Sequence, residues 1–203
     1  TKLFLPQKGS ISIDGIDIRQ LDPSEIRENI GYVAQEPWLI AGTIEQNISL
    51  GATDIKSEEI IEAANISTAT EFINKHTKGF KQVLDERGEG LSGGQKQALT
   101  VARALVQKPP IFIFDEPTSS MDAKTEKKFI ENFKRYNPEA TLLLITHRTS
   151  LLSLVDKVIV IDQGKIVGSG SVDGFLKATK TGKDSSKVGS SPPGPTMTDP
   201  VTP

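Results

Sequence analysis

Three short apolar stretches of the sequence each end in polar residues that could do chemistry. They are 30–34, followed by Gln35; 111–114, followed by Asp115 and Glu116; and 142–145, followed by Thr146 and His147. In an open parallel α/β sheet, ligands bind beyond the carboxyl ends of the strands, so these side chains are expected to meet at one edge. Each group taken singly also has a purely structural explanation. For example, Asp115 and Glu116 before Pro117 could simply end a strand.

A second feature is the pentapeptide Leu91–Gln95, which opens a strongly amphipathic stretch. Ser92 is a good helix N-cap, and the two glycines after it let a ligand approach the backbone closely. The free N–H groups and the positive end of the helix dipole would then form an anion site. The alternative is a glycine loop that only starts a helix.

The order and spacing of these segments resemble the nucleotide-binding domain of ABC transporters, from about Gly9 to Leu176. Leu91–Gln95 is similar to the ABC signature, and Ile111–Glu116 is similar to Walker B. Gln35 is similar to the Q-loop glutamine, Ser119–Asp122 to the D-loop and His147 to the switch histidine. The implied fold is α/β: a P-loop NTPase-like (RecA-like) core with a mainly parallel sheet, plus the ABC helical subdomain.

The resemblance implies ATP and Mg²⁺ as cofactors and an ATPase activity coupled to transport. Asp115 and Gln35 would hold the metal. Glu116 would polarise the attacking water, a role that suits a carboxylate at a strand's open end, and His147 would contact the γ-phosphate. The residues expected to bind nucleotide, or to lie at the interface across it, are Gln35, Ser92, Gly93, Gly94, Gln95 and Asp122.

Partners follow from the same resemblance. Ser92–Gly94 would act in trans on ATP held by a second ATPase domain in a head-to-tail dimer, and Glu86–Gly90 would touch a transmembrane exporter domain. The alternative for Glu86–Gly90 is a solvated charged loop. Segments 35–48 and 86–90 resemble the exporter branch of the family. Within that branch, segments 71–73, 116–122 and 146–152 are most similar to type I secretion ATPases of RTX toxins or adhesins, which predicts a place on the cytoplasmic face of a bacterial inner membrane. Lipid, drug and peptide exporters remain possible.

Local patterns predict the elements that position these residues. A hairpin is expected over 10–18, a short helix over 22–29 capped by Asp22, and helices from Ser57, around 69–73, over 95–106 and over 124–136. Strands over 30–34, 111–114 and 142–145 would form a buried parallel sheet, and 158–167 a closing hairpin. The expected domains are a partial core (1–56), a helical subdomain (57–108), the rest of the core (109–178) and a disordered tail (179–203).

Composition excludes several classes of function. The 24 basic and 26 acidic residues nearly cancel, which gives no reason to expect nucleic-acid binding. Without cysteine, disulfides, Cys-ligated zinc and thiol catalysis are excluded. No apolar run approaches the ~18–20 residues of a membrane span, so a partner would have to cross the membrane.

The sequence has no G-x-x-x-x-G-K-[ST] string, the P-loop that cradles phosphates and reaches them with its lysine. Only Thr1–Leu5 stands where the family would place it, so we expect the P-loop strand to be missing and ATP to bind poorly to these residues alone. Three hypotheses remain: the C-terminal portion of an exporter ATPase, a degenerate partner that donates its signature in trans, and a soluble ABC protein. The first predicts an in-frame P-loop preceded by apolar spans in the DNA upstream.

Overall fold

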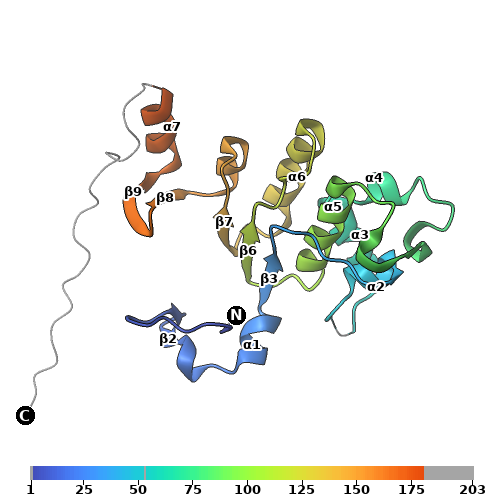
Figure 1. Cartoon of the computed structure of the whole chain (residues 1–203), viewed down its shortest axis with the longest axis horizontal. Coiled ribbons are helices and arrows are strands. Elements are labelled where there is room, and N and C mark those ends of the chain that lie inside the picture. Colours follow the sequence, from blue (N-terminus) through green and yellow to red (C-terminus); the bar gives the residue numbers. More distant parts are fainter. Residues whose placement is uncertain (1, 53, 181–203) are drawn as a thin grey trace, which may run out of the picture. The chain divides into compact units, whose positions relative to one another are not determined.

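The computed structural model describes residues 2–52 and 54–180 of the 203-residue chain (Figure 1). The described residues form two compact units, one ending at His147 and the other beginning at Arg148. The first unit is α/β, as predicted, and carries the polar residues at the strand ends. Among the described residues, no helix is both long enough and apolar enough to cross a lipid bilayer.

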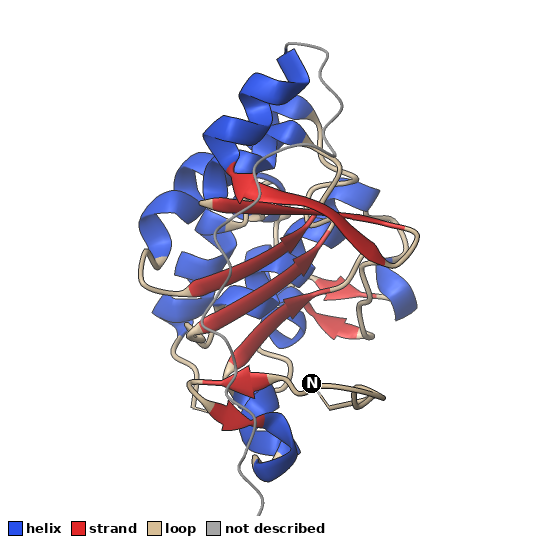
Figure 2. Ribbon diagram, turned by 90° about the vertical axis from the view of Figure 1, so that its left-hand side faces the viewer, coloured by secondary structure: helices blue, strands red, loops and turns tan. Residues whose placement is uncertain are grey.

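A three-stranded parallel sheet forms the centre of the first unit (Figure 2). Its strands, in spatial order, are β3 (Ile30–Val33), β6 (Ile111–Asp115) and β7 (Thr141–Ile145). Val33 pairs with Phe114, and Asp115 pairs with Ile145. The three predicted strands and their parallel arrangement are therefore confirmed, and the polar residues after each strand lie at the same edge of the sheet.

Burial alternates along β6, and its two fully buried side chains pack against α6. Phe112 and Phe114 are fully buried and contact the ring of Phe133 at centroid distances of 5.5 and 5.3 Å. Phe133 lies on α6 (Ala123–Tyr136), whose hydrophobic stripe also includes the fully buried Phe129. Large aromatic side chains bury much apolar area, so this cluster fixes α6 against the sheet.

Helix α5 (Gly93–Leu105) packs beside β3, as Figure 1 shows. Gly31 of β3 faces the carbonyl oxygen of Ala104 so closely that a Cβ could not fit between them. The sequence predicted this helix over 95–106 with Ser92 as its cap. The cap is confirmed, and the helix begins two residues earlier than predicted.

The N-terminal elements of the first unit follow local sequence signals. Strands β1 (Ser12–Ile13) and β2 (Ile16–Asp17) pair through a turn at Asp14 and Gly15, both with positive φ. Two positive-φ residues are what a type I′ hairpin turn requires. A 3₁₀ turn (Ile18–Gln20) then leads to α1 (Pro23–Glu28), capped by Asp22 as predicted.

The region between β3 and α5 holds elements that were only partly predicted. They are β4 (Gly42–Thr43), α2 (Ile44–Ile48), α3 (Ser57–Ile66), α4 (Thr70–Ile73), the 3₁₀ turn Gly79–Lys81, β5 (Val83–Leu84) and the 3₁₀ turn Glu86–Gly88. Helix α3 begins at Ser57, as predicted. Its cap position is Lys56, whose backbone N–H donates to the Glu59 carboxylate at 2.9 Å.

The second unit contains a 3₁₀ segment (Thr149–Leu154), strands β8 (Lys157–Asp162) and β9 (Lys165–Ser171), and α7 (Val172–Lys180). The two strands form the predicted antiparallel hairpin, with a bulge at Val160/Ile161. Helix α7 was not predicted, and it contains residues 179 and 180, which were assigned to the tail. The rest of the predicted tail, 181–203, lies outside the described residues.

Candidate functional site

The carboxylate of Glu116 is the centre of the polar cluster at the sheet edge. The backbone N–H of His147 donates to its Oε1 at 2.9 Å, and the ring Nδ1 of His147 lies 2.7 Å from the same oxygen. The Thr146 hydroxyl donates to Oε2 at 3.3 Å. The structure thus joins the residues that follow β6 to those that follow β7.

Exposure differs sharply between the two principal members of this cluster. The Glu116 side chain is 12% exposed, whereas the His147 side chain is 79% exposed. The carboxylate favours a proton on Nδ1, which leaves Nε2 as the ring nitrogen available to a ligand. The pair can therefore present a buried carboxylate and an accessible imidazole at one point.

Glu116 adopts a left-handed backbone conformation, with φ of 48°. Such a φ costs a residue with a Cβ roughly 1–2 kcal/mol, and the following Pro117 restricts it further toward extended conformations. The peptide is held on both sides: its N–H donates to the Ile145 carbonyl at 2.9 Å, and its carbonyl accepts from Gln97 Nε2 at 2.8 Å. Strain of this kind gathers at functional sites.

Asp115 and Gln35 lie at the same edge but outside the contacts around Glu116. Asp115 is the last residue of β6, opposite Ile145, and is partly exposed. Gln35 is exposed, two residues beyond Val33 at the end of β3. The sheet register therefore brings both predicted metal ligands to the expected edge.

The N-terminus of α5 is closed by a capping box. Ser92 Oγ accepts the Gln95 N–H at 3.3 Å, and Gln95 Oε1 accepts the Ser92 N–H at 2.8 Å. The side chains of Ser92 and Gln95 thus stabilise the start of the helix. The amides of Gly93 and Gly94 belong to the first turn, where the helix offers them no carbonyl partner.

The two glycines differ in what surrounds them. A Cβ on Gly94 would lie 2.9 Å from the backbone oxygen of Ser120, whereas a Cβ on Gly93 would meet only the Ser120 side chain, at 3.2 Å. Gly94 is therefore required by packing against the 119–122 loop of its own chain. Gly93 is exposed and faces a side chain that can rotate away.

A family model described as "ABC transporter" matches residues 1–119 of this chain. The chain belongs to the ABC transporter family. It is 41% identical over 177 residues to the mitochondrial potassium channel ATP-binding subunit of Mus musculus, covering 87% of this chain and 25% of that protein. It is 37% identical over 179 residues to the leukotoxin export ATP-binding protein of Aggregatibacter actinomycetemcomitans, covering 88% and 25% respectively.

A solved structure of a bacterial Atm1-family ABC exporter with ATP bound matches with a TM-score of 0.82 at 34% identity. The match covers 87% of this chain and 31% of that one. The fold is thereby that of an ABC exporter nucleotide-binding domain. This chain spans about a quarter of the length of the curated relatives described above.

Asp122, the residue predicted to lie at an interface, caps α6. Its carboxylate accepts the backbone N–H groups of Lys124 and Thr125, both at 3.0 Å, and the Thr125 hydroxyl at 2.8 Å. These bonds, that of the Thr125 N–H foremost, hold the pKa of the Asp122 carboxyl below its usual value. Asp122 is exposed, so its backbone position remains open to a partner.

Two buried polar groups behind the site were not singled out from the sequence. Thr118 donates to the Glu126 carboxylate at 2.6 Å, which ties the loop after Glu116 to α6. Gln97, fully buried on α5, bonds to Glu116, Ser119 and Ser120. A signal for Gln97 was present, because it shares a helix face with Val101 and Leu105, both fully buried.

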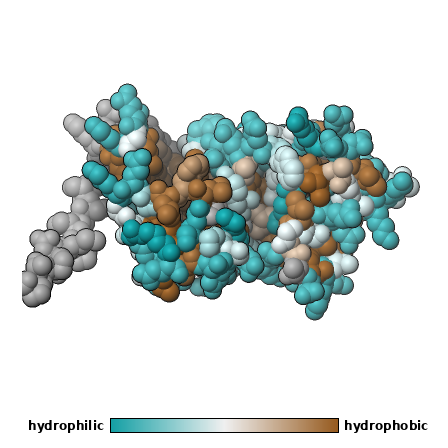
Figure 3. Space-filling model, turned by 60° about the horizontal axis from the view of Figure 1, so that its bottom comes forward, coloured by the Kyte–Doolittle hydropathy of each residue, from teal (hydrophilic) through white to brown (hydrophobic). Residues whose placement is uncertain are grey.

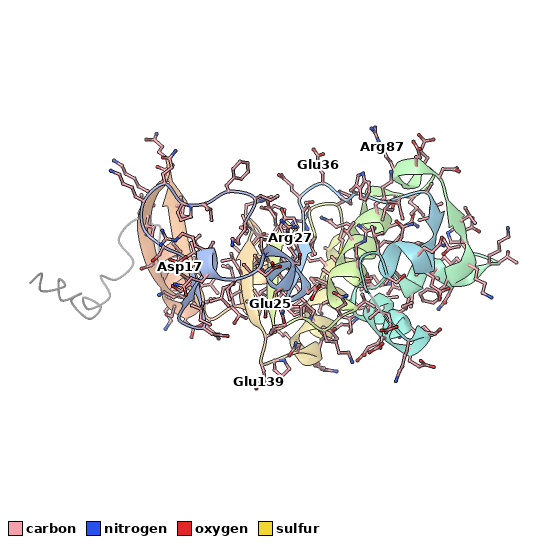
Figure 4. All side chains as sticks on the ribbon, turned by 90° about the horizontal axis from the view of Figure 1, so that it is seen from below. Asp17, Glu25, Arg27, Glu36, Arg87 and Glu139 are labelled. Carbon is pink, nitrogen blue, oxygen red and sulfur yellow. The ribbon has the colours of Figure 1, made fainter. Side chains whose placement is uncertain are left out.

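The segment after Gln35 lies against the segment 86–90. Gly88 lies so close to the buried Leu39 that a Cβ on it would meet the leucine side chain at 2.7 Å. Glu36 and Arg87 project from the same side of the first unit into solvent (Figure 4). Trp38, between Glu36 and Leu39, is 59% exposed.

Arg103 of α5 is hydrogen-bonded to the backbone of the segment after Gln35. Its guanidinium donates to the carbonyl of Asn47 at 2.7 Å, to the carbonyl of Trp38 at 2.9 Å and to Asn47 Oδ1 at 3.2 Å. Burial lowers the pKa of the guanidinium without threatening its charge. The backbone that carries Trp38 is therefore anchored to α5.

The donor set is compatible with Mg²⁺ held mainly by nucleotide. Among residues 2–52 and 54–180, no group of three or more His, Cys, Asp or Glu side chains is arranged to hold a metal ion. Magnesium commonly takes one or two protein carboxylates and completes its shell with phosphate and water oxygens. Asp115, a partly exposed carboxylate at the strand end, fits that requirement.

Proposed function

We propose that this chain is part of the ATP-hydrolysing domain of an ABC exporter. The observation that carries the proposal is the cluster of Glu116, Thr146 and His147 at the sheet edge, together with the capped, glycine-bearing start of α5. The exporter relatives and the ATP-bound exporter structure support the same assignment. Coupling of ATP hydrolysis to transport belongs to this proposal.

In the proposed reaction, Glu116 accepts a hydrogen bond from the attacking water. Its carboxylate is mostly buried and held by two neighbours, so little reorganisation is needed to place it. His147 presents its exposed ring to the γ-phosphate while Nδ1 stays against Glu116. Asp115 and Gln35 would hold Mg²⁺, which supplies neutralisation of phosphate charge when it is bound.

Ser92, Gly93 and Gly94 are proposed to act on ATP held by the P-loop of a second ATPase domain. The first amides of α5 and the positive end of its dipole suit phosphate oxygens. Asp122 would lie at the same interface. Gly93 is exposed at this helix end and can therefore be approached by a second domain.

The surface formed by Glu36, Trp38 and the 86–90 segment is proposed to meet the transmembrane domain. Figure 3 shows that hydrophobic residues are exposed among hydrophilic ones on one face of the molecule. Trp38 supplies an exposed aromatic anchor, and aromatic residues are enriched where protein surfaces meet. Arg103 would transmit a movement of that surface to α5.

For the transported substrate we propose a secreted protein, as in type I secretion, at the cytoplasmic face of a bacterial membrane. The leukotoxin export relative supports this class. The mitochondrial relative from mouse is similar at 41% identity, so the substrate class and the bacterial setting rest on the sequence resemblance of 71–73, 116–122 and 146–152.

A domain exchange tests the function and the substrate class together. Residues 10–176 would replace the matching segment of a leukotoxin exporter, which keeps its own P-loop and membrane domain. We expect toxin secretion to persist and to be abolished by Glu116→Gln in the exchanged segment. Secretion unaffected by Glu116→Gln would contradict the catalytic assignment. ATP turnover without secretion would contradict the substrate class alone.

A further inference from the structure

Gln97 of α5 has all of its side-chain polar atoms engaged by the loop that follows β6. Nε2 donates to the Glu116 carbonyl at 2.8 Å and to Ser119 Oγ at 3.0 Å. Oε1 accepts the Ser120 backbone N–H at 2.8 Å. A fully buried amide that is hydrogen-bonded through both its nitrogen and its oxygen helps to fix the groups it contacts, because losing these bonds inside the protein is costly.

The contact with Glu116 falls on a strained backbone. Glu116 has φ of 48° and precedes Pro117, so its local preferences do not select this conformation. Its N–H donates to the Ile145 carbonyl, and its carbonyl accepts from Gln97 Nε2 and from the Ser119 backbone N–H at 3.1 Å, so Gln97 is the contact that ties this carbonyl to α5. The carboxylate direction follows from this backbone conformation, and it brings Oε1 against His147.

The contact with Ser120 joins the same residue to the start of α5. The Cβ positions of Gly93 and Gly94 both face Ser120. One side chain therefore fixes, in a single arrangement, the Glu116 backbone, the 119–122 loop and the helix end that carries the signature amides.

We propose that Gln97 is a positioning residue that sets the direction of the Glu116 carboxylate and couples it to the signature end of α5. This inference rests on the proposed catalytic role of Glu116. It adds that movement of the signature helix, when it closes on a partner's nucleotide, reaches the Glu116–His147 pair of the same chain through one amide. Gln97 contacts no reacting atom and acts only through Glu116 and Ser120.

The test compares Gln97→Met with Thr100→Val in the whole chain. Methionine matches the length of glutamine but makes none of its hydrogen bonds. Thr100 is also buried on α5, and its hydroxyl donates only within the helix, to the Gln97 carbonyl at 2.9 Å, so it controls for loss of a buried polar group. Circular dichroism and thermal melting would show that each variant is folded.

The decisive readout is the imidazole of His147, followed by ¹H–¹⁵N NMR at one fixed pH. The chain has two histidines, and His76, which packs against Phe72, serves as the internal reference. We expect Gln97→Met to shift the His147 Nδ1 resonance and to speed exchange of its backbone amide by about tenfold. Thr100→Val should change neither. Unchanged His147 signals in folded Gln97→Met would overturn the proposal.

A second variant keeps the test decisive if Gln97→Met fails to fold. Gln97→Glu retains an oxygen to accept the Ser120 N–H and replaces the nitrogen that donates to the Glu116 carbonyl and to Ser119 Oγ. It should show the same His147 change, and a wild-type His147 spectrum in this variant would also overturn the proposal.

A turnover assay separates this inference from the proposed function. The chain would be mixed with a P-loop-bearing ABC domain and MgATP. We expect stimulated hydrolysis with the wild type and a fall of about tenfold with Gln97→Met, because the 119–122 loop and the signature end lose their shared anchor. Stimulation that Gln97→Met leaves intact contradicts the coupling. No stimulation by the wild type contradicts the proposed function, while the His147 measurement still decides the role of Gln97.

Discussion

At the scale of single residues, the site depends on groups that serve two purposes. Ser92 caps α5 and stands at the proposed phosphate contact, and Asp122 caps α6 and stands at the proposed interface. Gly94 is needed because its own chain leaves no room for a side chain, whereas Gly93 is open. A loss of activity at Gly94 would therefore report on folding, and Gly93 is the position that reports on the partner's nucleotide.

The difference between the glycines is measurable as stability. Gly94→Ala places a Cβ 2.9 Å from the Ser120 carbonyl oxygen, and we expect it to lower the free energy of unfolding by about 1–2 kcal/mol after the gain in helix propensity. Gly93→Ala should be nearly neutral, because the Ser120 side chain can move. Urea denaturation midpoints of the two variants test this. Equal midpoints would show that the close approach at Gly94 does not exist in solution.

Asp122 makes a prediction about pH. Its folded-state pKa lies below the ordinary value of 3.8, so its ionised form adds stability that is present above that value and is lost as pH falls through the lower folded-state pKa. Asparagine caps helices well but does not titrate. We expect the melting temperature of wild type to exceed that of Asp122→Asn at neutral pH, with the gap closing below about pH 4. A gap independent of pH would contradict the carboxylate's role in the cap.

At the scale of elements, α5 connects the three parts of the proposed machinery. Its 13 residues span roughly 20 Å. Its first turn carries the signature amides, Gln97 one turn later holds Glu116, and Arg103 near its end holds Trp38 and Asn47. A rigid helix contacting all three can pass a displacement from the Trp38 surface to the catalytic cluster without local unfolding.

The hydrogen bonds of Arg103 can be removed by substitution without changing the first turn of α5. Arg103→Met keeps the aliphatic stem but leaves the carbonyls of Trp38 and Asn47 without their donors, and we expect a loss of about 2–3 kcal/mol in unfolding free energy. Relative to wild type, hydrogen exchange of the backbone amides of 38–48 should become faster, while exchange of the amides of β6 and β7 should change less. The exposed Arg135→Met on α6 is the control and should change stability by less than about 0.5 kcal/mol. Uniformly faster exchange would argue against a local anchor.

At the scale of the whole molecule, the sequence predicted what local chemistry determines. Neighbouring residues determine the Asp14-Gly15 turn, the Asp22 cap and the Ser92 cap. The apolar stretches that form β3, β6 and β7 were also recognisable in the sequence. The α2 capping box of Thr43 and Gln46 is equally local and was overlooked, as was the cap position of Lys56, whose N–H Glu59 binds.

What the sequence could not show are contacts between distant residues. The left-handed φ of Glu116 is held by Ile145 and Gln97, 29 and 19 positions away in the sequence, in addition to a local bond from the Ser119 N–H, and the distant partners could not be read from the sequence. The anchoring of Trp38 by Arg103 crosses 65 positions. Candidate site residues were thus found from their motifs, and the groups that hold them were found only from the fold.

The central claim is that the signature end of α5 acts on nucleotide held by another domain. Sedimentation of the chain with a P-loop-bearing ABC domain whose own catalytic glutamate is replaced by glutamine tests it most directly. We predict a one-to-one complex in MgATP that is absent without nucleotide and absent with Gly93→Asp, because an aspartate there would repel the phosphates. A complex that forms equally without ATP, or that Gly93→Asp leaves intact, would contradict the claim.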